Sequence, residues 1–290
     1  MREPFFLTVK SRLFFYFFQA GSNPAAFQPN SLFRMEYHGE GNWSKQESWA
    51  QPGEIAWQYQ IENDTAYVMS YLGDHYGLKF PKIKVYFNKS SDGINWEPVN
   101  SSQPVIYVGG ISEIGWMFDL EGIVYGVGRN EDGDTSGWGR RVLTNVNKSF
   151  TCFGSQSDPN IIESPRMFRH GNDLYLVGRT DPTGTFQINN WAEDLLPKNL
   201  HHYLDLGEYS LRPHGNAIWK VLKGSGKLWK MLDLPGCGDT SFPSILRVGA
   251  HKYWLANYSS PLDVCYSWPW ILGQISKKGT QIHIIELEFI

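Results

Sequence analysis

The chain has 290 residues, of which 41% are hydrophobic, and this content is ample for a large core. Its formal net charge of −3 gives no basic footprint, so we do not expect a nucleic-acid partner. It has no apolar run of the roughly 18 residues that a transmembrane helix needs, so we predict no membrane span.

One phrase recurs five times along the chain. It consists of an acidic residue, a short apolar strand, a polar turn and a second apolar strand, and its copies begin at Glu3, Glu54, Glu113, Glu163 and Asp239. A period of about 50 residues indicates a repeat architecture, and a single apolar hairpin cannot bury its own faces. We therefore predict an all-β fold: one β-propeller domain over residues 1–290 with five recognisable four-stranded blades. A β-sandwich or a β-helix is the alternative, but neither explains why the opening acid keeps its place.

The chain opens inside its first blade, which begins at Glu3. No convincing signal peptide precedes this blade, because Met1-Arg2 leads directly into an acid and a proline. The last blade, from Asp239 onward, has only three clear strands, whereas propellers usually close by borrowing a strand from the other end of the chain. We expect the native N-terminus to be incomplete, and the missing part could hold a sixth blade.

The second blade ends in the turn Ser90–Trp96. We expect Asp92 to accept main-chain N–H bonds, Gly93 to supply a left-handed conformation and Trp96 to pack between sheets. These tasks are structural rather than catalytic.

The third blade contains a polar, Gly-rich stretch at 129–140. Glu131, Asp132 and Asp134 offer oxygen ligands that suit calcium, but their spacing is not that of an EF-hand loop. We expect a solvated loop here, with no metal site and no cofactor.

The fourth blade carries an insertion at 181–216, which lengthens the last interval of the repeat. Within it, residues 191–196 predict a short helix that ends before Pro197. We expect the insertion to lie over one face of the disc and to shape a pocket there.

The three cysteines, Cys152, Cys237 and Cys265, form no CxxC pair, so a thiolate metal site is not expected. Two arrangements stay open: one disulfide with one free thiol, or three buried thiols. Asn-x-Ser/Thr sequons, most of them at predicted turns, favour a secreted or lumenal glycoprotein; the alternative is an Asn-rich surface that is never glycosylated. The sequons begin at Asn42, Asn63, Asn88, Asn100, Asn147 and Asn257.

Three segments resemble known propellers. Ser90-x-Asp92-Gly93-x-x-Trp96 resembles a shortened Asp-box, the turn of sialidase-like (BNR-repeat) propellers. Residues 238–244 and 253–260 together resemble a late blade of exo-sialidase-like proteins. Glu163-Ser164-Pro165 is similar to the acid-x-Pro entry of five-bladed furanosidases and arabinanase-type glycosidases. The sialidase-like and the arabinanase-type resemblances both imply a propeller that acts on carbohydrate, although a likeness in fold alone does not determine function.

The opening acids are the main candidates for chemistry. The innermost strands of a propeller converge on its axis, so we expect the five opening acids to ring one end of the central channel. Glycoside hydrolysis needs two carboxylates, and crowding like charges raises at least one pKa and so supplies an acid. The alternative is that these acids bond to loop N–H groups and only close the blades. Our catalytic candidates are Glu54, Glu113, Glu163 and Asp239, and the sialidase resemblance adds Tyr258 as a nucleophile.

Arginines are the candidates for substrate binding, because the sialidase resemblance implies an arginine cluster that holds a substrate carboxylate. Arg129 and Arg179 follow the same Tyr-x-Val-Gly phrase in successive blades, so they should occupy equivalent places. No clean arginine triad emerges. The substrate-binding candidates are Arg2, Glu3, Arg129, Arg166, Arg179 and Arg212.

We predict a monomeric, sialidase-like exo-glycosidase that hydrolyses a terminal sugar of a carbohydrate or glycoconjugate. Two alternatives stay open. One is a non-catalytic glycan-binding propeller, in which the acids and tryptophans bind sugar without cleaving it. The other is a protein-interaction propeller, which an apolar patch on the disc face would indicate.

Overall fold

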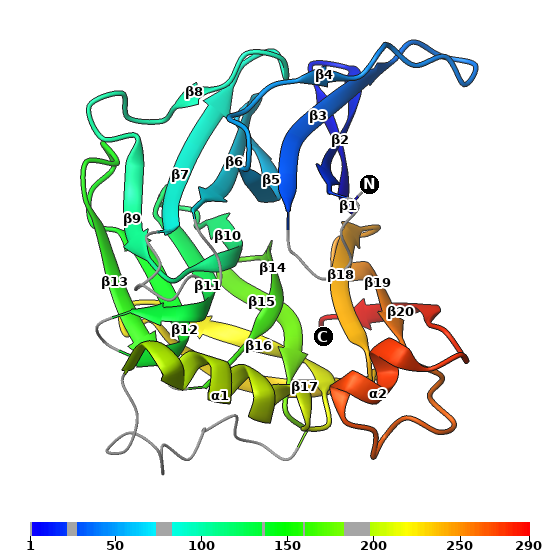
Figure 1. Ribbon diagram of the computed structural model, residues 1–290. Helices are drawn as coiled ribbons and strands as arrows, with labels where there is room; N and C mark the ends of the chain where they lie inside the picture. Colours follow the sequence, from blue (N-terminus) through cyan, green and yellow to red (C-terminus); the bar gives the residue numbers. More distant parts are fainter. Residues whose placement is uncertain (1, 22–27, 74–82, 135–136, 159, 183–197) are drawn as a thin grey trace.

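The computed structural model describes residues 2–21, 28–73, 83–134, 137–158, 160–182 and 198–290. Five antiparallel sheets follow one another around a common axis, which confirms the predicted five-bladed β-propeller (Figure 1). In each sheet the strands follow chain order from the axis to the rim, so the first strand of every blade is innermost.

Four blades have four main strands, and the fifth has three. The first blade contains β1 (Arg2–Val9), β2 (Arg12–Ala20), β3 (Pro29–Tyr37) and β4 (Glu47–Ser48). The second contains β5 (Ile55–Glu62), β6 (Thr65–Leu72), β7 (Ile83–Ser90) and β8 (Glu97–Pro98), with β9 (Val105–Gly109) also paired to β7. The third contains β10 (Ser112–Phe118), β11 (Val124–Asp134), β12 (Gly137–Asn145) and β13 (Phe153–Asp158). The fourth contains β14 (Glu163–His170), β15 (Asp173–Thr180), β16 (Gly215–Leu222) and β17 (Lys227–Leu234), and the fifth β18 (Thr240–Arg247), β19 (Lys252–Ser259) and β20 (Gln281–Glu288).

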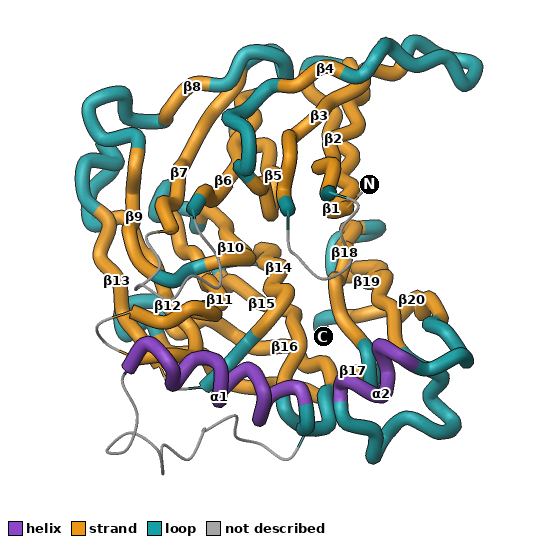
Figure 2. Tube along the Cα trace, viewed as in Figure 1, coloured by secondary structure: helices purple, strands orange, loops and turns teal. Residues whose placement is uncertain are grey.

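Two helices complete the described fold, α1 (Lys198–Ser210) and α2 (Trp270–Ile275). They lie outside the sheets and contact each other, and α1 also contacts β11 (Figure 2). The helix expected at 191–196 lies outside the described residues. No helix in the described part of the chain is long and apolar enough to cross a membrane.

Tight turns explain why the inner hairpins form. Lys10 and Ser11 both have positive φ between Val9 and Arg12, and Asn63 and Asp64 repeat this geometry in the second blade. Two consecutive left-handed residues give the turn whose twist matches a β-hairpin. The polar turn in the recurring sequence phrase therefore fixes the register of these two hairpins.

A break in pairing recurs in the innermost strand of every blade. The register shifts near the start of β1, β5, β10 and β14, and after Ser241 in β18. Glu3, Glu113 and Ser164 have positive φ at these breaks, which is uncommon for residues other than glycine. Such bulges bend a strand and re-aim its side chains, so the opening acids leave the regular pleat.

One side chain connects three blades. Gln58 of β5 donates from Nε2 to the carbonyl oxygens of Trp116 (3.0 Å) and Met167 (2.8 Å). Its Oε1 accepts from the N–H groups of the same two residues, at 3.3 and 3.0 Å. Gln58 is 2% exposed, so it satisfies main-chain groups that water does not reach.

The third blade differs from our expectation. Residues 129–140 were expected as a solvated loop, but β11 and β12 extend through most of this stretch. Glu131 and Asp132 are buried, so the expectation was wrong for them. The hairpin continues because strand pairing satisfies the main chain of this polar sequence. Among the described residues no cluster of three or more His, Cys, Asp or Glu side chains could hold a metal ion.

Other local predictions are confirmed. Asp92 accepts from the N–H groups of Ile94 and Asn95 at 2.8 Å, and Gly93 has φ +73°. The Trp96 ring packs against Tyr16 of the first blade. The cysteines adopt the first of the two open arrangements, with a Cys237–Cys265 disulfide and an exposed, free Cys152. The sequon asparagine Asn257 is buried, so this site is closed to glycosylation in the fold.

We predict that Gln58→Leu lowers the free energy of unfolding by about 2–4 kcal/mol, because it leaves buried main-chain groups in two neighbouring blades without partners. Urea denaturation measures the change. Gln60→Leu is the matched control, since the Gln60 side chain is half-buried in the same strand and has no side-chain hydrogen bond in the described structure. Equal losses in the two variants would contradict the bridging role of Gln58.

Candidate active site

Opening acids and arginines from several blades meet where the innermost strands begin. We call Glu3, Glu113, Glu163, Arg129, Arg166 and Arg179 the acid–arginine cluster. The inner-strand bulges aim its acids, and its members come from the first, third and fourth blades.

Arg129 is the centre of this cluster. Its guanidinium lies 3.4 Å from Glu113 Oε1 and 3.0 Å from Glu131 Oε1, and it forms a close ion pair with Glu163. One cation therefore contacts carboxylates of two blades. Without it, these acids would repel one another in a region with little solvent.

Glu163 is sealed inside the cluster. Its side chain is 1% exposed, and Arg179 Nη1 donates to its Oε2 at 2.9 Å. Burial raises the pKa of Glu163 to about 7, while Arg129 and Arg179 pull it down. The carboxylate is thus poised between its two protonation states near neutral pH.

Glu113 is more open than Glu163 and is held in one orientation. The Ser164 N–H of the next blade donates to its Oε2 at 2.7 Å, and Arg129 lies on its other oxygen. Its side chain keeps 12% of its surface exposed. Two donors on two oxygens hold the carboxylate in a fixed orientation.

Glu3 and Arg166 influence each other through their charges. Burial raises the pKa of Glu3 to about 7, and the Glu113 charge adds to the rise, whereas Arg166 opposes it. Arg166 reaches across from the fourth blade, between the rings of Phe5 (5.4 Å) and Trp57 (5.3 Å), and donates to the Trp57 carbonyl. Burial lowers the pKa of Arg166 to about 10, so it remains a cation at neutral pH.

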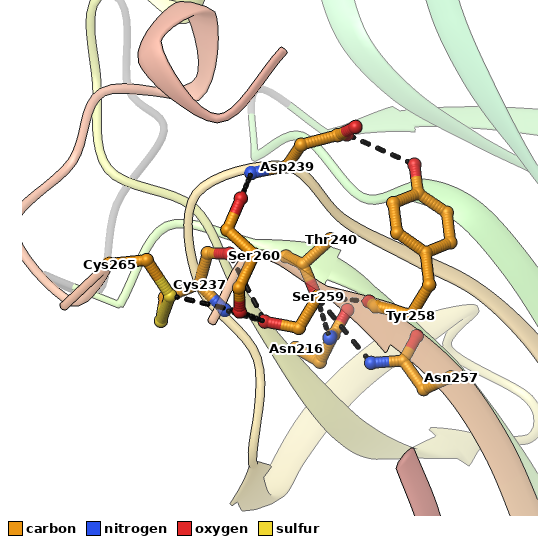
Figure 3. Close-up of a disulfide and its surroundings, with 9 residues drawn as sticks. All are labelled: Asn216, Cys237, Asp239, Thr240, Asn257, Tyr258, Ser259, Ser260 and Cys265. Carbon is orange, nitrogen blue, oxygen red and sulfur yellow. Dashed lines mark hydrogen bonds between the residues drawn. A yellow bond between two sulfur atoms is a disulfide. The ribbon is translucent and has the colours of Figure 1, made fainter. Parts of the chain in front are cut away.

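Asp239 and Tyr258 form a hydrogen-bonded pair in the fifth blade. Tyr258 OH donates to Asp239 Oδ1 at 3.0 Å (Figure 3). Burial raises the pKa of Tyr258; Arg179 opposes the rise, and Asp239 and Glu113 add to it. The pair lies next to the acid–arginine cluster, because Arg179 Nε donates to the carbonyl of Thr240, the residue after Asp239, at 2.7 Å.

The insertion covers part of the cluster through residues that sequence reasoning missed. Tyr209 of α1 accepts from Arg179 Nη1 at 3.3 Å, and its ring lies 5.8 Å from the Arg129 guanidinium. His214, fully buried, bonds from Nε2 to the Tyr209 carbonyl at 3.0 Å. Burial lowers the pKa of His214 well below its ordinary value, with Arg179 and Arg129 adding to the effect, so it is neutral. No motif in the sequence of the insertion predicts these contacts.

Three of the residues that we predicted for the site lie apart from the cluster. Glu54 accepts hydrogen bonds from Ser70 Oγ at 2.5 Å and from the Gln51 N–H at 3.3 Å. Both bonds are local to the second blade. Arg212 pairs with Asp181 and Glu208 within the insertion. Arg2 is exposed and acts on Glu3 only through its charge.

The fold is shared with solved structures. No protein-family model and no curated protein sequence matches this chain. A protein of unknown function from Dyadobacter fermentans aligns with a TM-score of 0.65 and 12% identity, over 99% of this chain and 76% of that one. A GH43 β-xylosidase/α-arabinofuranosidase from a compost microbial metagenome, solved with xylotriose, aligns at 0.53 and 12%, over 98% and 90%. An exo-1,5-α-L-arabinanase from a bovine ruminal metagenomic library aligns at 0.51 and 12%, over 99% and 93%. At these low identities the alignments show a shared fold, the five-bladed propeller.

We predict that Arg129→Met lowers the free energy of unfolding by about 3–5 kcal/mol, because it leaves buried carboxylates without their cation. The loss should be larger at pH 8 than at pH 5. In the variant the folded state holds protons that the unfolded state releases, so stability falls as pH rises. Urea denaturation at both pH values measures this.

The matched control is Arg12→Met, which breaks the more exposed Arg12–Glu36 pair at 2.6 Å. It should cost less than about 1 kcal/mol. An Arg129→Met loss that is equally small, or independent of pH, would contradict the central role of Arg129.

Proposed function

We propose that the protein is a glycoside hydrolase that removes a terminal sugar at the acid–arginine cluster. The observation that carries this proposal is the meeting of Glu3, Glu113 and Glu163 with three arginines, and the pKa of Glu3 and of Glu163 is raised to about 7. Carboxylates in contrasting environments are what acid–base cleavage of a glycosidic bond requires. Solved glycosidases with this fold add support.

Glu3 is our candidate for the general acid. Its raised pKa keeps it partly protonated near neutral pH, and its side chain is partly exposed. Glu163 has a similar pKa, but it is sealed behind Arg129 and Arg179 and does not face solvent. Glu3 is therefore better placed to give a proton to the departing sugar oxygen.

Glu113 is our candidate for the nucleophile or general base. The Ser164 N–H and Arg129 hold it in one orientation. Glu163 acts through Arg129, whose position it fixes, so it is a positioning residue in this mechanism. In this assignment a proton donor and a fixed carboxylate belong to one cluster, which is the pair of roles that hydrolysis with either stereochemical outcome needs.

The Tyr258–Asp239 hydrogen bond favours a second candidate, a sialidase-like reaction. There Tyr258 is the nucleophile and Asp239 accepts its proton. Arg129 and Arg179 are both paired with Glu163, which leaves fewer donors to hold a substrate carboxylate. We therefore favour a neutral terminal sugar. Tyr258→Phe separates the candidates, because it abolishes turnover only in the second.

We also propose a secreted or lumenal location. The Cys237–Cys265 disulfide supports it, since such bridges persist in oxidising compartments. Mass spectrometry of the protein from its native host tests this through the state of the two cysteines: a fully reduced pair would contradict it.

We predict that Glu113→Gln lowers kcat at least about 1000-fold, and that Glu3→Gln lowers it about 100-fold or more on substrates with poor leaving groups. Activated aryl glycosides need no proton from the enzyme, so they should restore most of the Glu3→Gln rate. The assay is steady-state kinetics on aryl arabinofuranosides, xylosides and sialosides.

Glu54→Gln is the matched control, because Glu54 begins the same sequence phrase but lies apart from the cluster. It should change kcat less than about tenfold. Full turnover in both Glu113→Gln and Glu3→Gln would overturn the proposed mechanism.

A second prediction concerns pH. If Glu3 is the general acid, kcat/KM should fall as pH rises through about 7, because the deprotonated carboxyl cannot donate. This alkaline limb should disappear in Glu3→Gln and persist in Glu54→Gln. A limb that is unchanged in Glu3→Gln would assign the acid to another group.

A further inference from the structure

The only disulfide among the described residues closes the hairpin that carries Asp239 and Tyr258. Cys237 and Cys265 are 28 residues apart in sequence, with β18 and β19 between them, and their Cα atoms are 5.4 Å apart. The Cys237 N–H also donates to Ser259 Oγ at 3.0 Å. Figure 3 shows the bridge and the Asp239–Tyr258 pair in one small region.

The main chain of Asp239 is held from two further sides. Its N–H donates to Ser260 Oγ at 3.1 Å, and its carbonyl accepts from the Ser260 N–H at 2.8 Å. Helix α2 lies directly against it, because a Cβ atom on Gly273 would lie 2.0 Å from Asp239 N. Only glycine allows this approach, so α2 fixes how far Asp239 can move.

Such support is needed because strand pairing is irregular here. The β18–β19 register shifts just after Ser241, and Ser241 (φ +125°) and Phe242 (φ +55°) have strained backbones. Strained residues persist only where their surroundings over-determine them. The bridge, Ser260 and α2 supply restraints that an interrupted ladder lacks.

Asp239 lies next to the proposed site, because Arg179 Nε of the cluster donates to the carbonyl of the adjacent Thr240 at 2.7 Å. Its Oδ1 accepts from Tyr258, and its Oδ2 has no hydrogen bond within the described structure. The carboxylate is partly exposed. Tyr258, its partner, stacks on Phe242 at 5.7 Å and lies in the field of Arg179 and Glu113. Oδ2 is therefore available to accept a hydrogen bond from a sugar hydroxyl.

We propose that the Cys237–Cys265 bridge and helix α2 position the Asp239 carboxylate to bind a hydroxyl group of the substrate sugar, so that activity requires the oxidised bridge. This inference rests on the proposed glycosidase function. Asp239 contacts the substrate, whereas Cys237, Cys265 and Gly273 are positioning residues. A dithiol reductant therefore lowers the activity. The S–S bond takes up two electrons and two protons to give two thiols, and the dithiol is oxidised to its own disulfide.

The first test compares Cys237→Ser/Cys265→Ser with Cys152→Ser, which changes the free cysteine and serves as the matched control. We expect the double variant to raise KM at least tenfold with a smaller change in kcat, since a substrate contact is weakened rather than the acid–base pair. The control should match the parent chain. Dithiothreitol should reproduce the double-variant effect on the parent chain and leave the variant unchanged.

A second arm reads the position of Asp239 without activity. In ¹³C-tyrosine NMR, the Cζ signal of Tyr258, assigned by its loss in Tyr258→Phe, reports the bond to Asp239. This signal should shift in the double variant and stay in place in Cys152→Ser. If the parent chain cleaves no glycoside, the sugar contact falls with the proposed function, and this arm still decides whether the bridge positions the pair.

A third arm covers loss of folding in the double variant. Gly273→Ala leaves the bridge intact and adds a methyl group against Asp239, so it should raise KM and shift the same NMR signal. The control is Gly207→Ala in α1, where the added Cβ would meet nothing within 4 Å. An unchanged KM and Tyr258 signal in both Gly273→Ala and the double variant would overturn the proposal.

Discussion

The hydrogen bonds of Gln58 are the interaction on which the rest of the structure depends. A propeller brings inner strands of different blades together at its axis, where main-chain groups lose water but have no strand partner on that side. Gln58 meets this need in the third and fourth blades with one amide. Trp57 adds a similar bond, from its indole N–H to the Pro165 carbonyl at 2.8 Å. These bonds hold β10 and β14 at fixed positions, and therefore also Glu113 and Glu163, which lie at the starts of these strands.

Fixed inner strands explain how several acids can share one small region. Like charges in a poorly solvated place repel, and this repulsion would push the blades apart if nothing opposed it. Arg129 opposes it by contacting acids of two blades, and Arg179 adds a second cation on Glu163. The inner-strand bulges complete the arrangement, since a regular pleat would send alternate side chains to opposite faces of each sheet.

Much of the fold could be predicted from the sequence, because the hairpin signal is local and repeats. The blade number, the turns and the approach of several opening acids all follow from that repeat. The role of Gln58 could not be predicted, since one amide in a strand looks like an exposed residue until its partners about 58 and 109 positions away are known. The contacts of Tyr209 with Arg179 and Arg129 could not be predicted either, because they depend on the position of an insertion that has no repeat pattern.

The case of Glu54 shows why one sequence phrase gives different sites. In the third and fourth blades, the second strand carries an arginine opposite the start of the first: Arg129 pairs with Ser112, next to Glu113, and Arg179 pairs with Glu163. The second blade has Tyr71 in the corresponding place, paired in the ladder with Ile55, next to Glu54. Without a nearby guanidinium, burial raises the pKa of Glu54, and its carboxylate is satisfied by Ser70 within its own blade. In these three blades the residue across the hairpin accounts for whether the opening acid joins the cluster, whereas Glu3 of the first blade has Phe18 near it across the hairpin and meets Arg166 of the fourth blade instead.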